Sequence, residues 1–200
     1  MRAGLRFLRG SRRLRVITWS SAALAAIDSA WFALLVLFIE NDLGFGPTAF
    51  GIFLAVGALG GLFGAALAGR YLKVDLAGLA LGVFVLMAGS LLGLAAFPNV
   101  AVTAIVLVLS SGGFALWNVF MASARQRVTP NAMLGRVGAA YRTVVVAASI
   151  LGAIAGGIIA GMSSIRWTLA VGGIAALLAA PLVSIGFRPA RDQDGPSVSN

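Results

Sequence analysis

Residues 123–142 read SARQRVTPNAMLGRVGAAYR, and this stretch decides how the rest of the chain is organised. It carries four arginines. The run before it, residues 100–124, is uncharged, and the run that follows, residues 137–165, has Arg142 as its one charge. A cationic segment between two apolar runs of this length is typical of a short cytoplasmic loop between membrane helices. We therefore assign the other segments relative to this loop.

The composition excludes a soluble domain. The chain is 60% hydrophobic and 10% charged, with a mean hydropathy of +1.00, whereas soluble domains carry about 25% charged residues. It contains neither cysteine nor histidine, and no apolar run holds paired carboxylates, so the usual nucleophile–base and metal constellations are missing. We expect no enzymatic activity, metal or cofactor. The net charge of +9 permits nucleic acid as a partner, but its placement at helix ends favours a lipid bilayer.

Six apolar runs each provide about the 20 residues that a helix needs to cross a bilayer. The first run is too long for a cleaved signal peptide, whose apolar region spans about 7–15 residues. Residues 1–15 form a basic amphipathic segment expected on the cytoplasmic membrane face, and residues 188–200 form a polar tail. We expect an all-α membrane bundle whose six helices span residues 16–39, 48–69, 76–97, 100–124, 137–162 and 167–187.

The basic residues predict the orientation of these helices. Of the 15 lysines and arginines, 13 fall on the side of residues 123–142, Arg166 falls on the opposite side, and Arg142 lies inside a helix. Cytoplasmic loops carry the excess of lysine and arginine. We therefore expect a multi-pass protein of the plasma membrane with both termini in the cytoplasm.

Asp28 is the sharpest single feature, because it lies midway along the first expected helix and so near the bilayer centre. An ionised carboxylate there costs about 2.5–3.5 kcal/mol on insertion scales, so it must face a wet cavity or a partner. Ser21, Trp31 and Phe32 lie on roughly the same face of the helix. Two interpretations stay open: a site for protons or cationic substrates, or a neutral carboxyl hydrogen-bonded to a neighbouring helix.

A second polar group lies on the fourth expected helix, where Ser111 and Asn118 are two turns apart and Trp117 is adjacent. These residues either contact substrate or form hydrogen bonds between helices, worth about 0.6 kcal/mol each in a membrane. The second interpretation is favoured. Arg142 lies about 8 Å inside the fifth helix, at a depth similar to that of Asn118. The two are candidates for an inner gate, and snorkelling of Arg142 to the membrane surface is the alternative.

The cytoplasmic loop is expected to be rigid. Thr129 is placed to cap a short helix, Pro130 suits its first position, and Gly135 can end it. Such a turn would hold the fourth and fifth expected helices at a fixed spacing.

The second and fifth expected helices are rich in glycine. Glycines four residues apart allow close contact between helix backbones in a membrane. A dinucleotide-binding loop is excluded, because no strand accompanies these glycines. The candidates for helix packing are Gly57, Gly60, Gly61, Gly64, Gly152, Gly156, Gly157 and Gly161.

Residues 117–142, WNVFMASARQRVTPNAMLGRVGAAYR, resemble the loop between the tenth and eleventh helices of the major facilitator superfamily, closest to its enterobactin and macrolide exporters. Residues 3–15 look like the end of that family's central linker, and residues 51–70 look like its eighth helix. The chain departs from the family in having six helices instead of twelve and a reduced charged signature after residue 69. The candidates for a cytoplasmic loop and gate are Arg125, Gln126, Pro130, Gly135, Arg136 and Arg142.

The resemblance implies the C-terminal half of a transporter, built as a 3+3 inverted repeat. It implies that the first and fourth helices line a central cavity for a small-molecule substrate, and that the glycine-rich helices meet the other half. Because Met1 falls inside what resembles a linker, we expect a truncated or split gene product. Its partner would be an N-terminal six-helix half or a second copy of the chain.

Two functions are therefore considered. The first is export of small amphipathic compounds by alternating access, driven by protons through Asp28. The alternative is a membrane subunit without transport activity, which packs with another half-transporter or with itself.

Overall fold

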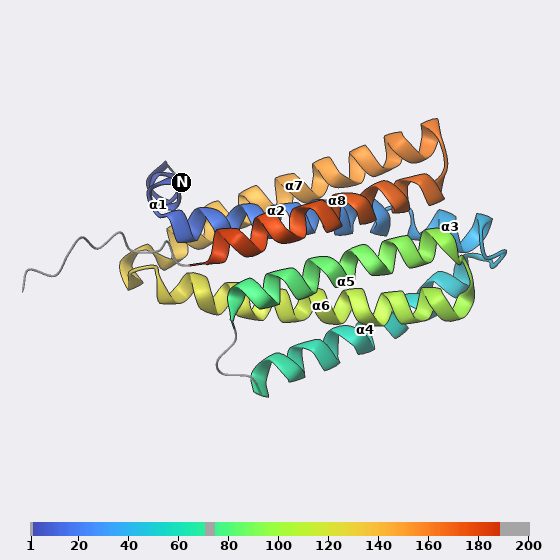
Figure 1. Ribbon diagram of the computed structural model, residues 1–200, viewed down its shortest axis with the longest axis horizontal. Helices are drawn as coiled ribbons and strands as arrows, with labels where there is room; N and C mark the ends of the chain where they lie inside the picture. The colour runs from blue at the N-terminus through green and yellow to red at the C-terminus, as the bar shows by residue number, and fades with distance from the viewer. Residues whose placement is uncertain (1, 71–74, 189–200) are drawn as a thin grey trace, which may run out of the picture.

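The computed structural model describes residues 2–70 and 75–188, and its regular structure there is entirely helical (Figure 1). In this part of the chain, six helical segments are long and apolar enough to cross a membrane, which confirms the predicted fold class at that level. Lys73 and the tail from residue 189 lie outside the described residues. The six segments are Arg12–Asn41, Thr48–Arg70, Leu76–Ala96, Val100–Arg127, Asn131–Met162 and Ile165–Phe187.

The first segment consists of two helices, α2 (Arg12–Phe32) and α3 (Leu35–Asn41), whereas the sequence predicted one helix over 16–39. Two turn-type hydrogen bonds bridge the break: Ala33 N–H donates to Ser29 at 3.1 Å, and Leu34 N–H donates to Trp31 at 2.9 Å. A break inside a bilayer is tolerated when its backbone groups stay paired in this way.

The basic segment before the first span forms α1 (Arg2–Gly10), which packs on the start of α7 (Leu134–Met162). Gly4 lies against the carbonyl group of Arg136, so closely that a Cβ on Gly4 would overlap it. Leu8 and Leu14 are buried together with Val137. Protein rather than lipid therefore covers part of the apolar side of the segment, and residues 12–15 belong to α2.

The loop between α6 (Val100–Arg127) and α7 differs from the prediction. A single 3-10 turn, η1 (Asn131–Met133), leads directly into α7, so that Gly135 lies inside that helix instead of ending the turn. The Thr129 hydroxyl donates to the Arg125 carbonyl at 2.7 Å and caps no helix. The Arg125 guanidinium lies 4.0 Å from the centre of the Tyr141 ring and thereby ties α6 to α7.

The outermost helices are α4 (Pro47–Arg70) and α7, which lie at opposite edges of the bundle in Figure 1. The helix α4 packs on α6, and α7 packs on α2. Between them, α5 (Leu76–Ala96) packs on α8 (Ile165–Phe187), and these two helices contact α6 and α2 respectively.

Glycines make both of the outer contacts close. A Cβ on Gly60 would overlap the backbone of Val108, and one on Gly64 would overlap the backbone of Gly112. Gly57 meets Ser111 and Leu107 one turn earlier along α4. The α4–α6 contact is therefore a backbone-to-backbone crossing of the kind that glycine spacing permits in membranes.

The same arrangement recurs between α7 and α2. A Cβ on Gly152 would overlap the backbone of Ala26, and one on Gly156 would overlap the backbone of Ala30. Gly57, Gly60, Gly64, Gly152 and Gly156 therefore have their close neighbours within this chain, and a contact of these helices with another half stays a prediction. Sequence spacing identifies a close-packing face but does not say which helix covers it.

The remaining three glycine candidates face open space. A Cβ added at Gly61, Gly157 or Gly161 would meet no atom within 4 Å in the described part of the chain. Each outer helix therefore has one glycine face that is covered by the chain and a second glycine position that is not.

This difference between neighbouring glycines gives a test. We expect Gly60→Ala and Gly156→Ala to destabilise the bundle by about 1–3 kcal/mol, because the added methyl group forces the helix backbones apart. Gly61→Ala and Gly157→Ala are the matched controls and should leave thermal unfolding in detergent unchanged. Equal effects within either adjacent pair would contradict the described packing.

Candidate functional site

A pocket of about 280 Å³ lies between the C-terminal end of α2, which is near the middle of the first span, and the middle of α6. Asp28 is half-buried in its wall. The structure thus brings together residues that are far apart in the sequence. The polar side chains at the pocket are Asp28, Ser110, Ser111 and Asn118, and the aromatic ones are Trp31, Phe32 and Phe114.

Ser110 and Phe114 are pocket residues that the sequence analysis did not single out. The sequence analysis selected Ser111 and Asn118 because they are two turns apart on one helix face. That Ser110 also faces the pocket depends on the rotation of α6, which the structure shows. The serine pair itself was the available signal, because two adjacent hydroxyl groups are unusual inside an apolar helix.

The polar groups of α6 are mostly engaged within their own helix. Ser110 donates to the Leu107 carbonyl at 3.4 Å, and the Asn118 side-chain amide donates to the Phe114 carbonyl at 3.0 Å. Between side chains of different helices, the described residues form the hydrogen bonds Trp117–Ser21 and Arg166–Asp42, and neither involves Asp28. In this arrangement, no neighbouring helix donates a hydrogen bond to the Asp28 carboxylate.

Trp31 adds a second polar feature. Its side chain is 3% exposed, and its indole Nε1 has no hydrogen-bond partner in the described part of the chain. A buried indole N–H without a partner is unusual, because the group usually finds one. Trp31 and Asp28 thus line the same wall of the pocket, while the indole Nε1 itself is buried.

Ser21 and Trp117 do not line this pocket. Trp117 Nε1 donates to the Ser21 hydroxyl at 3.0 Å, and the bond is buried between α2 and α6. The Trp117 ring lies edge-on to Phe84 of α5 and to Phe187 of α8, at 5.8 and 6.3 Å between ring centres. Trp117 therefore joins four helices, which agrees with the interhelical rather than the substrate interpretation of this residue.

The proposed inner gate is not assembled in the described structure. Arg142 is exposed on α7, in a groove with Ala139, Thr143 and Ile150, while Asn118 lies at the pocket on α6. Gln126 and Arg136 are exposed near the loop. The Arg125–Tyr141 contact links one gate candidate to α7, through a residue that the sequence analysis did not single out.

No group of three or more histidine, cysteine, aspartate or glutamate side chains is arranged to hold a metal ion within residues 2–70 and 75–188. The chemistry of the pocket is therefore that of one carboxyl, hydroxyl and amide groups, and aromatic walls.

Six helical segments that are long and apolar enough to cross a bilayer, two of which enclose a pocket with a single carboxyl, define a multi-pass helical membrane protein. Residues 1–198 match the model of the transmembrane secretion effector family, and the chain belongs to this family of the major facilitator superfamily. Family membership indicates a secretion or efflux transporter, a class whose members are typically not enzymes. No curated protein and no solved structure matches the chain.

The Ser21–Trp117 hydrogen bond can be measured by a double-mutant cycle. We expect Ser21→Ala and Trp117→Phe to show a coupling free energy of about 0.6 kcal/mol, the mean for such contacts in membrane proteins. Unfolding in mixed micelles provides the four stabilities. Strict additivity of the two substitutions would contradict a direct bond between these side chains.

Proposed function

We propose that the chain forms one six-helix half of a proton-coupled exporter of small, cationic amphipathic compounds. The observation that carries this proposal is the position of Asp28, half-buried in a pocket at mid-membrane depth with aromatic and hydroxyl-bearing neighbours. Ionisable residues within membrane helices are rare and mark ion or substrate pathways by default.

The pocket chemistry suggests how coupling works. An amphipathic cation places its charge beside the Asp28 carboxylate and its apolar part against Phe32 and Phe114. A carboxyl without its cation takes up a proton, because an isolated charge is costly in hydrocarbon. Binding of the cation and binding of the proton therefore exclude each other at one group, as antiport requires.

The inverted-repeat arrangement is supported by the paired glycine contacts. If α2, α4 and α5 of the first triplet correspond to α6, α7 and α8 of the second, the α4–α6 contact corresponds to the α7–α2 contact. The α4–α6 pair and the α2–α7 pair run in opposite directions through the bundle. In both pairs, two glycines of the outer helix, four residues apart, lie on the inner helix. Inverted three-helix repeats with a site between them are a common transporter design.

This correspondence also relates the two sides of the pocket. Asp28 lies midway between the contact residues Ala26 and Ala30, and Ser110 lies midway between Val108 and Gly112. Asp28 and Ser110 thus hold equivalent positions, and both line the pocket. The proposed substrate site is therefore on the axis that relates the two repeats.

The orientation with both termini in the cytoplasm is supported by the distribution of charge. Arg166 and Asp42 form an ion pair with a 3.0 Å distance between Nε and Oδ1, at the end of the bundle that holds the α7–α8 turn. The basic residues of α1, Arg70 and the α6–α7 loop belong to the other end. We place the Arg166 end outside the cell, in agreement with the excess of positive charge in cytoplasmic loops.

A second bundle is needed to complete the cavity. The described residues that line the pocket all come from α2 and α6, so the facing walls would come from another six-helix half or a second copy of the chain. In the superfamily, two six-helix halves close around the substrate. The alternative, a subunit without transport activity, is an outcome of the test below.

The transport proposal predicts the effect of Asp28→Asn. With the chain reconstituted in proteoliposomes, alone and with a co-expressed six-helix half, tetraphenylphosphonium should release protons, detected by a trapped pH dye. Asp28→Asn should abolish this release, because an amide cannot exchange a proton for a cation. Glu40→Gln, at the exposed end of α3, is the control and should retain the signal.

Two results would contradict the transport proposal. Proton release that survives Asp28→Asn would remove Asp28 from the coupling mechanism. Absence of transport by the wild-type chain in both preparations would favour the non-transporting subunit.

Orientation can be tested cleanly because the chain has no cysteine. We expect Ser163→Cys to react with a membrane-impermeant maleimide on intact cells, because the α7–α8 turn is assigned to the outside. Gln126→Cys should react only after permeabilisation. The reverse labelling pattern would invert the topology.

A further inference from the structure

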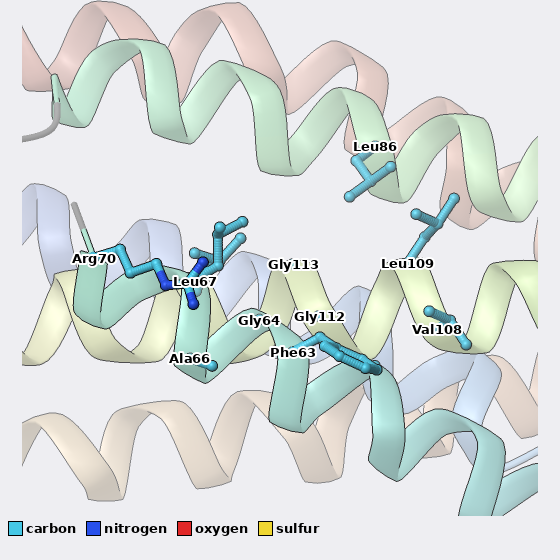
Figure 2. Close-up of a pocket in the computed structure, with 12 residues that line it drawn as sticks. Phe63, Gly64, Ala66, Leu67, Arg70, Leu86, Val108, Leu109, Gly112 and Gly113 are labelled. Carbon is cyan, nitrogen blue, oxygen red and sulfur yellow. The ribbon is translucent and has the colours of Figure 1, made fainter.

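A groove of about 550 Å³ runs along the outer side of the bundle between α4, α5 and α6 (Figure 2). It is separate from the Asp28 pocket, with which it shares no lining residue. Glycines form its floor, because Gly60 and Gly64 cross Gly112 and Val108 at backbone distance and leave no side chains to fill the space. Phe63, Leu86 and Leu109 are among its apolar walls.

Arg70 is the single charged residue among those described at this groove. It is the last residue of α4, and its side chain is exposed. Figure 2 places its guanidinium nitrogens beside Leu67, on the side of the groove. Within residues 2–70 and 75–188, the one ion pair is Arg166–Asp42, so the structure gives Arg70 no carboxylate partner.

The dimensions of the groove fit one leaflet of a bilayer. Its α4 wall extends from Gly60 to Arg70, which at the α-helical rise corresponds to about 15 Å. Half of the hydrocarbon core of a bilayer is also about 15 Å thick. An acyl chain lying in the groove would therefore end near the bilayer centre when its headgroup is level with Arg70.

We propose that this groove binds an anionic phospholipid of the cytoplasmic leaflet, with one acyl chain against Phe63 and Leu109 and the phosphate on Arg70. The apolar walls and single cation complement an amphipath with a negative headgroup. A phosphate accepts bidentately from the guanidinium. A zwitterionic phospholipid offers the same phosphate, but its ammonium group cancels the negative charge, so the net attraction to Arg70 favours an anionic lipid. The assignment of the leaflet rests on the proposed orientation, and the site itself does not depend on transport.

Two other surface grooves also combine one arginine with mostly apolar lining residues. One, of about 460 Å³ between α2 and α8, holds Arg15 as its charged lining residue, and the other, of about 530 Å³ on α7, holds Arg142. Neither has a described carboxylate in its wall. The Arg70 groove is the one that three helices build, and for that reason it is the site that we assign.

Native mass spectrometry of the full chain in detergent tests the site with two probes, phosphatidylglycerol and phosphatidylcholine with identical acyl chains. We expect the wild-type chain to retain phosphatidylglycerol preferentially. Arg70→Gln should lower its retention about fivefold, the size expected for one cationic contact at an anionic membrane surface. Arg127→Gln, an exposed arginine that does not line the groove, is the matched control and should retain the lipid.

A second pair of variants tests the path of the acyl chain. Ala66 lines the groove and Ala65 does not, although both are exposed on α4. Ala66→Phe should reduce retention of both lipids, whereas Ala65→Phe should reduce neither. Equal losses for the two arginine variants would show a general attraction to the basic surface and overturn the proposal. Unchanged retention in Ala66→Phe would exclude the groove as the acyl site.

Discussion

The packing of α2 and α6, each with its outer helix and with each other, is the constraint on which the candidate site depends. Ser21 and Trp117 join these helices through a buried 3.0 Å hydrogen bond, and further along the same helices enclose the Asp28 pocket. Helices in lipid gain nothing from hiding apolar surface, so close backbone packing and hydrogen bonds must hold them together. The outer helices use the first of these means: α4 attaches to α6 and α7 attaches to α2 through glycine crossings. Each outer helix is therefore held by one of the two pocket helices, and the packing of α5 on α8 joins the two sides of the bundle.

The charged contacts of the described residues lie at the two ends of the bundle, away from the pocket. The Arg166–Asp42 ion pair joins α8 to the end of α3, and the Arg125–Tyr141 contact joins α6 to α7 at the opposite end. Between these two layers, Asp28 is the ionisable side chain at the pocket. A single carboxyl among aromatic side chains, at the depth expected for the bilayer centre, is suited to cations. The arginines at the groove ends favour anions by the same reasoning, so cationic substrates and anionic lipids are assigned to different surfaces.

The sequence predicted the parts of this structure that depend on the bilayer and failed at those that depend on neighbours. Six spans follow from the length of apolar runs, and Asp28 stood out because any charge in such a run is costly. The break at Ala33 and Leu34 has no proline or glycine that would predict it, and only the structure shows the local change of hydrogen bonding there. Gly60 and Gly61 look equivalent in the sequence, yet one meets α6 and the other meets nothing, because the rotation of α4 selects between them. Ser110 was missed for the same reason, and the expected Thr129 cap failed because its hydroxyl bonds back to Arg125.

The central claim is that Asp28 is an accessible, exchangeable carboxyl that a cation occupies. Modification by a lipid-soluble carbodiimide, which reacts with protonated carboxyls, tests this directly when the labelled residue is identified by peptide mass spectrometry. The account predicts labelling at Asp28 that falls as tetraphenylphosphonium is added, while any labelling at Glu40, Asp42 and Asp75 stays constant. Labelling of Asp28 that the cation does not protect, or an Asp28 that never reacts, would contradict the account and leave the carboxyl as a structural group.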